Sequence, residues 1–116
     1  MLPVELSRQR EENSAELTLR ADPCLFWFRG HFPTQPILPG VAQIDWVMHY
    51  GTALLAPAYR FSAIENVKFQ QPVLPGATLV LTLRWQVETN RLLFEYAVTG
   101  ADAPQRASSG KILLCR

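Results

Sequence analysis

Few side chains in this sequence are able to move protons near neutral pH. The chain contains only two histidines, His31 and His49, and Asp45 is the only carboxylate between Asp22 and Glu65. A histidine changes its charge near neutrality, and a carboxyl group in an apolar setting has a raised pKa, so both kinds of group can exchange protons near pH 7. These residue types point to general acid–base chemistry.

Asp45 lies within residues 41–55, a proline-free stretch that is apolar on nearly every side. Such a pattern predicts a buried helix. Because Asp45 stands between Ile44 and Trp46, an ionised carboxylate there is costly unless it is paired. Two interpretations are open: a neutral acid that holds and delivers a proton, or a carboxylate that accepts N–H bonds from a neighbouring loop.

A proline-rich loop carries His31. The prolines at positions 33, 36 and 39 are incompatible with a regular helix and favour a stiff, extended loop. Gly30 permits unusual backbone angles beside the imidazole, and a stiff loop would hold the ring ready to act as a general base. The alternative is a histidine with a purely structural role.

Gly40 is expected at the start of the helix. Backbone N–H groups there lack helical partners and carry partial positive charge, so one aimed at a carbonyl oxygen would stabilise an oxyanion. A glycine needed only for the turn explains the residue equally well. His49 lies four residues after Asp45, on the same helix face, where it could bind Asp45, line a pocket or cap the polar side of the helix.

The rest of the chain predicts sheet. Residues 1–13 end in a polar run and are expected to be partly disordered at the start. Alternation of apolar and polar residues begins at Ala15. Further strands are predicted over residues 61–69, 78–87, 92–99 and 106–114. One helix cannot cover both faces of a sheet, so the fold class is α+β, a curved antiparallel sheet wrapped round one central helix. Residues 1–116 are expected to form a single domain.

Composition narrows the function classes. The chain is 48% hydrophobic and 18% charged, which is typical of a folded protein, and its net charge of +1 gives no reason to expect nucleic acid. The two cysteines lack zinc-site spacing, and no apolar run approaches the ~20 residues of a membrane span. The charged N-terminus lacks an apolar signal region, which predicts a cytoplasmic protein. Surplus apolar surface favours association with a second copy.

The chain resembles the 3-hydroxyacyl-[acyl-carrier-protein] dehydratases of fatty acid synthesis in the run GHFPTQPILPGV, residues 30–41, followed by a carboxylate fourteen positions after His31. The run NVKFQQPVLPG, residues 66–76, resembles the family's segment after the central helix. The resemblance covers residues 25–83 and extends more loosely to the C-terminus. The short N-terminus looks more like that of the small dehydratases of aryl-polyene and related pathways.

The resemblance implies a hot-dog fold and a homodimer, or a higher homo-oligomer, in which two sheets join edge to edge and share each active site. His31 would be the base at C2 of the acyl chain, and Asp45 of the other subunit would protonate the leaving 3-hydroxyl. The Gly40 N–H would bind the thioester carbonyl, and Val41 and His49 would contact the substrate. No metal or redox cofactor is implied, because the phosphopantetheine arm belongs to the acyl carrier protein.

Some residues differ from the usual family pattern, and they limit the predicted reaction. Thr34 replaces a usual glycine and His49 a usual glutamine. Asp45 is typical of the isomerising branch but Val41 of the non-isomerising one, so only dehydration is predicted.

Other readings remain at this point. Arg29 and Arg60 are candidates for a basic rim that receives the acidic carrier, although solvated surface arginines explain them too. A hot-dog acyl thioesterase, in which the helix carboxylate activates water, is the alternative enzyme. A non-catalytic acyl-binding or assembly subunit is the alternative without chemistry.

Overall fold

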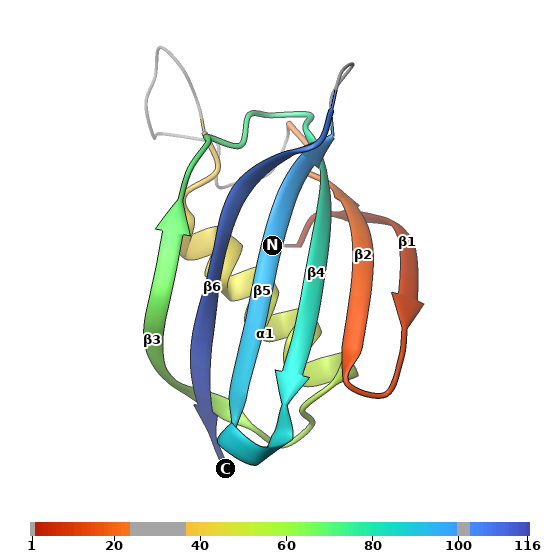
Figure 1. The fold of residues 1–116 in the computed structure, drawn as a ribbon. Helices are drawn as coiled ribbons and strands as arrows, with labels where there is room; N and C mark the ends of the chain where they lie inside the picture. The colour runs from red at the N-terminus through yellow and green to blue at the C-terminus, as the bar shows by residue number, and fades with distance from the viewer. Residues whose placement is uncertain (1, 24–36, 100–102) are drawn as a thin grey trace.

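A six-stranded antiparallel sheet curves round one long helix in the part of the chain that the structure describes (Figure 1). The structure, a computed structural model, describes residues 2–23, 37–99 and 103–116. The strand order is β1-β2-β4-β5-β6-β3. The elements are β1 (Val4–Arg10), β2 (Ser14–Arg20), α1 (Gly40–Leu54), β3 (Arg60–Phe69), β4 (Thr78–Gln86), the short helix η2 (Val87–Thr89), β5 (Arg91–Thr99) and β6 (Gln105–Cys115).

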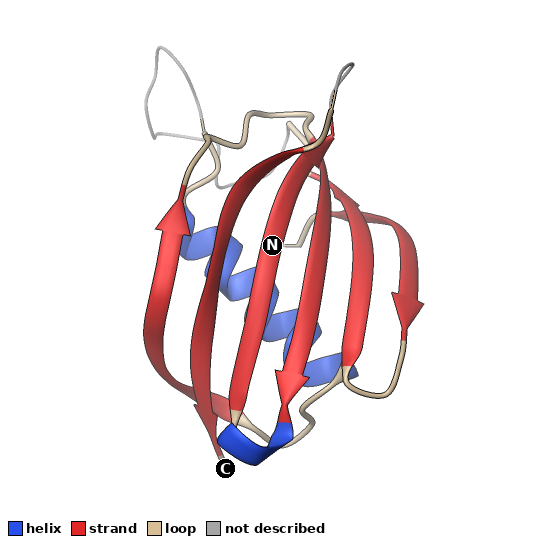
Figure 2. Cartoon of the chain, viewed as in Figure 1, coloured by secondary structure: helices blue, strands red, loops and turns tan. Residues whose placement is uncertain are grey.

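The helix lies across one face of the sheet, and the sheet bends toward it (Figure 2). Successive residues of a strand point to opposite faces, and on the helix-facing side of β2, β4, β5 and β6 most side chains are apolar and buried. Fully buried examples are Leu17, Leu19, Leu79, Leu81, Leu83 and Leu92, which belong to one core cluster with Trp46 and Val47 of the helix. The α+β prediction is confirmed.

The N-terminal prediction is wrong. Val4–Arg10 is an edge strand that pairs antiparallel with β2, whereas partial disorder was expected there. Every side chain of β1 is exposed, so no buried face distinguishes this strand in the sequence. Backbone pairing holds it instead, and Arg10 Nε donates a hydrogen bond of 2.8 Å to the carbonyl of Leu54 at the helix end.

The composition of the helix predicted burial on every side, but only one side of α1 is buried. Its inner face is buried through residues spaced three and four apart, namely Ala42, Gln43, Trp46, Val47, Tyr50, Gly51 and Leu54. The outer face exposes Val41, Asp45 and His49. A single curved sheet covers only one side of a helix, which leaves these three side chains exposed among the residues that the structure describes.

Two similar segments meet at the helix start. The sequence repeats Pro-x-Leu-Pro-Gly at residues 36–40 and 72–76. Leu38 donates its N–H to the carbonyl of Val73 at 2.8 Å, and both side chains are buried. Gly76 ends the second segment with φ of +84°, in the left-handed region that favours glycine. These contacts fix the chain immediately before α1.

Candidate active site

Three functional candidates form one stripe on the outer face of α1. Val41, Asp45 and His49 follow each other at intervals of four, which places them on the same side of the helix. All three are exposed in the single chain, and Val41 is 67% exposed. The expectation that Asp45 is buried is therefore wrong for the chain alone, because the sheet packs against the opposite side of the helix.

The structure brings Asp45 and His49 into one open hollow of about 530 Å³. Its wall is formed by the C-terminal half of the helix, the start of β3 and the N-terminus, through Leu2, Asp45, Met48, His49, Thr52, Tyr59, Arg60 and Phe61. Asp45 and His49 share this hollow without a hydrogen bond between these two described side chains. Of the three roles considered for His49, lining a pocket is the one the geometry favours.

Gly40 is the first residue of α1 and is closely packed. The ring of Phe69, at the end of β3, lies over it so that a Cβ at position 40 would stand 2.6 Å from the Phe69 Cζ. No side chain caps this helix start, and its first turn holds no acidic residue. The N–H groups of Ala42 and Gln43 both bond to the carbonyl of Pro39, at 3.1 and 3.3 Å. A side chain at position 40 would therefore have to displace the exposed ring of Phe69.

His31 lies outside the described residues, as do Arg29 and Thr34. The distance between His31 and Asp45 therefore stays a prediction. Arg60 is described, and it lines the hollow beside Asp45.

Sequence reasoning missed Gln43, a buried polar residue in the first turns of α1. Its side-chain oxygen accepts a hydrogen bond of 2.7 Å from the Ser108 hydroxyl, and its backbone carbonyl accepts one of 2.7 Å from the Tyr96 hydroxyl. Burial raises the pKa of Tyr96 well above its usual value, so this phenol stays protonated and donates. The available signal was the single amide side chain of the helix, next to the apolar residues Ala42 and Ile44.

In the described residues, no group of three or more His, Cys, Asp or Glu side chains is placed to hold a metal ion. Over the same residues, no helix has the length and apolar character needed to cross a bilayer.

The sequence matches the family model described as ApeI-like (ApeI dehydratase) over residues 7–111. The chain belongs to the ApeI-like dehydratase family. The match includes every candidate residue from His31 to His49.

Solved structures agree with this family. The chain is 53% identical to a protein of the dehydratase heterocomplex ApeI:P from Xenorhabdus doucetiae, with a TM-score of 0.94 over 100% of both chains. It is 54% identical to an uncharacterized protein from Erwinia carotovora subsp. atroseptica, with a TM-score of 0.92 over 99% of this chain and 97% of that one. A dehydratase domain of the polyketide protein PpsC from Mycobacterium tuberculosis, 21% identical with a TM-score of 0.71 over 99% of this chain and 44% of that one, shows the shared hot-dog fold.

Curated relatives are longer. The chain is 34% identical over 99 residues to the 3-hydroxyacyl-[acyl-carrier-protein] dehydratase FabZ of Pseudoalteromonas translucida, a match of 77% of this chain and 65% of that protein. It is 41% identical over 76 residues to FabZ of Pasteurella multocida, a match of 58% of this chain and 47% of that protein. The chain thus spans between about half and two thirds of these relatives.

Proposed function

We propose that this chain, acting as one hot-dog domain over residues 1–116, removes water from a 3-hydroxyacyl thioester to give a trans-2-enoyl thioester. The acyl group would be carried by an acyl carrier protein, in the synthesis of fatty acids or of polyene and related lipids. The observation that carries the proposal is the family match over residues 7–111, which includes the run GHFPTQPILPGV.

The proposed reaction is an elimination that needs two proton-transfer groups. His31 takes a proton from C2, which the neighbouring thioester carbonyl acidifies, and the Gly40 N–H stabilises the negative charge that develops on that carbonyl oxygen. Asp45 gives a proton to the 3-hydroxyl, which leaves as water while the C2=C3 double bond forms. His31 then loses a proton and Asp45 regains one. The chemistry requires no metal or redox cofactor.

A second subunit would complete the site. The exposed side chains Phe61, Ile64 and Phe69 of β3 pair across the ladder with Leu114, Ile112 and Ser108, which are buried on the helix side of the sheet. Because directly opposed residues share a face, these three side chains also point to the helix side. They lie at a sheet edge, and Phe61 lines the same hollow as Asp45.

Covering this edge would bury Asp45, an environment that suits a carboxyl group that must hold a proton. We propose a second copy of the chain as the cover, its β3 edge joining this one and its His31 facing this Asp45. The heterocomplex of the similar Xenorhabdus protein makes a different subunit the other candidate.

Arg60 lies at the hollow and supports a role in receiving an acidic carrier protein. Arg29 is proposed for the same rim from its place in the sequence.

The test is an assay of the purified protein with 3-hydroxyacyl and plain acyl thioesters. Absorbance of the conjugated enoyl product reports dehydration, and free thiol reports hydrolysis. We expect enoyl product without thiol release. His31→Ala and Asp45→Asn should each lower the rate by ~10²-fold or more, the usual effect of removing a general acid or base. Glu88→Gln, which neutralises an exposed carboxylate on η2, is the matched control.

Two outcomes would contradict the proposal. Thiol release without enoyl product would indicate a thioesterase. Binding of the acyl thioester without turnover, unaffected by either substitution, would indicate a non-catalytic subunit.

A further inference from the structure

Gln43 is a polar residue held in the core from several directions. Only 3% of its surface is exposed. Its side-chain N–H donates a long hydrogen bond of 3.5 Å to the carbonyl of Leu38, and its side-chain oxygen accepts the 2.7 Å bond from Ser108. Its backbone carbonyl is bound by Tyr96. Because Ser108 and Tyr96 are fully buried, these bonds exclude water.

The partners of Gln43 belong to separate parts of the fold. Ser108 lies on β6, and Leu38 lies in the segment that enters the helix. Leu38 is held on its other side by Val73. The Gln43 side chain therefore links the sheet to the point where the loop becomes helix. The Tyr96 bond uses the backbone of Gln43, so it does not depend on the side chain.

Stability alone does not account for this pair. A buried, fully bonded polar pair contributes little more than two apolar side chains of similar shape, whereas a pair broken on one side is costly. Such networks can instead specify one geometry. Among the described residues, every buried side-chain nitrogen and oxygen has a partner, so the pair is fully satisfied.

Few other polar contacts fix the helix start among the residues that the structure describes. It has no side-chain cap, and Phe69 packs over Gly40. A shift of the first turn would move the Gly40 N–H and the carbonyl of Leu38 together. We propose that Gln43, held by Ser108, is a positioning residue that fixes this first turn against β6. Its effect on catalysis, through the direction of the Gly40 N–H, rests on the proposed function.

The test uses Gln43→Leu, Ser108→Ala and the double variant in the full chain with any partner it binds. Amide hydrogen exchange at Leu38 and Ala42, whose N–H groups bond to Val73 and Pro39, reports the order of the helix start independently of catalytic activity. Exchange at Leu55, whose N–H bonds to Gly51, reports the far end of the helix. We expect exchange to rise by about 10-fold at the first two amides and to change little at Leu55.

Catalysis gives the second readout. For Gln43→Leu we expect kcat to fall by about 10-fold with KM nearly unchanged, because the carbonyl-binding geometry is disturbed and acyl-chain contacts are not. The double variant should be no worse than Gln43→Leu alone, since the two side chains act as one unit. Ser108→Ala, which removes one oxygen, keeps the test valid if Gln43→Leu does not fold.

Ile112→Val is the matched control, a fully buried residue on the same strand that opposes Leu92. It should lower the unfolding temperature while leaving kcat and exchange at Leu38 unchanged. The proposal is overturned if the Gln43 and Ser108 variants raise exchange evenly along the helix, or if they loosen the first turn without lowering kcat. A wild-type protein that forms no enoyl product would contradict the proposed function, and exchange at Leu38 would still decide the positioning.

Discussion

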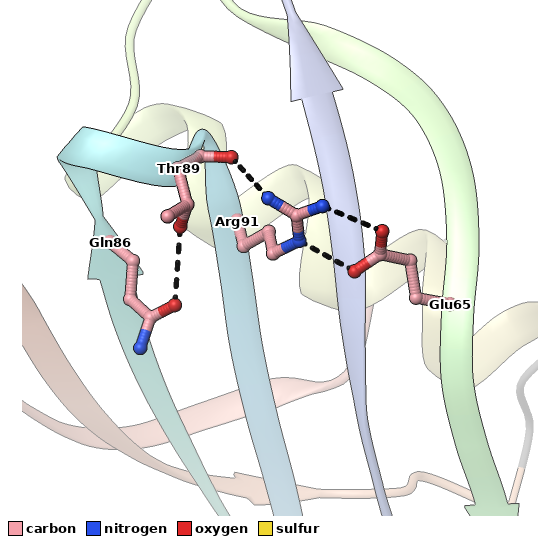
Figure 3. Close-up of polar contacts among 4 residues, drawn as sticks. All are labelled: Glu65, Gln86, Thr89 and Arg91. Carbon is pink, nitrogen blue, oxygen red and sulfur yellow. Dashed lines mark hydrogen bonds and ion pairs between the residues drawn. The ribbon is translucent and has the colours of Figure 1, made fainter.

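The ion pair between Glu65 and Arg91 ties the edge strand β3 to the turn between β4 and β5 (Figure 3). Arg91 Nε and Nη2 donate to the two oxygens of Glu65 at 2.6 and 3.0 Å, and Nη1 donates to the carbonyl of Thr89 at 2.8 Å. The hydrogen bond from Arg91 lowers the pKa of Glu65. Both side chains remain about one-third exposed, so solvent weakens the pair.

A pH dependence follows from that shift. The Glu65 pKa is lower in the folded chain than in the unfolded chain, where it lies near ~4.3, so the stabilisation is complete above that pH and is lost as pH falls through the folded value. Glu65→Gln should lower the urea midpoint at pH 7, and the difference from wild type should shrink below about pH 4. Urea unfolding of the wild type and of Glu65→Gln, at pH 7 and at pH 3, measures this difference in midpoint. A difference that grows on acidification would refute this assignment.

Single residues were predictable where their chemistry is rare in the sequence. Asp45 and His49 were identified from type and spacing, and the structure does place them in one hollow. The exposure of Asp45 was not predictable, because it depends on which side of the helix the sheet covers. Gln43 was missed because its importance comes from Ser108, 65 positions away in the chain.

At the scale of elements, the segment 72–76 supports the helix start and depends on Gly76. Its φ of +84° is strained for any residue with a Cβ, and the nearest atom to an added Cβ would be Pro23 Cγ, at 3.9 Å. Gly76→Ala therefore carries a backbone cost without a steric clash, about 1–2 kcal/mol. Thermal unfolding should show a midpoint lower by several degrees.

Ala58 offers the reverse substitution as a control. It has φ of +70° and is exposed in the turn after α1. Ala58→Gly should leave stability unchanged or raise it by up to about 1 kcal/mol, because relief of strain offsets the greater freedom of the unfolded chain. The account of these turns fails if Gly76→Ala is neutral while Ala58→Gly destabilises the protein.

Elements whose apolar residues follow a pattern were predicted well. The helix and the strands β2, β4, β5 and β6 bury one face, and their observed bounds agree closely with the predicted ones. β3 was also predicted, from its apolar residues, although none of its side chains is buried in the single chain. The edge strand β1 buries none of its side chains and is held by backbone pairing with β2. Only the three-dimensional structure therefore reveals it.

At the scale of the molecule, the β3 edge and the outer face of α1 form one exposed apolar surface in the described part of the chain. We define this surface by Val41, Phe61, Ile64 and Phe69, which are between 47% and 67% exposed. Exposed apolar surface of this kind marks interaction sites. The proposed partner would cover it and bury Asp45.

Ile64→Lys tests this surface. A charge at a 50% exposed position should leave the fold of the protomer intact but oppose burial at an interface. Sedimentation should show a shift from dimer to monomer, and dehydration should fall by ~10²-fold because each site loses its partner's group. Val87→Lys, at a 51% exposed position on η2, is the control and should change neither the oligomeric state nor the dehydration rate. A variant that stays dimeric and active would exclude this surface as the interface.

The central claim, that His31 and Asp45 of different protomers share one site, is tested most directly by complementation. His31→Ala and Asp45→Asn chains are each expected to be nearly inactive, and they are mixed in equal amounts under conditions that exchange subunits. Half of the dimers are then mixed, and each mixed dimer has one intact site, so enoyl formation should recover to about a quarter of the wild-type rate. A mixture that forms mixed dimers yet stays as inactive as its components would show that both groups act within one protomer.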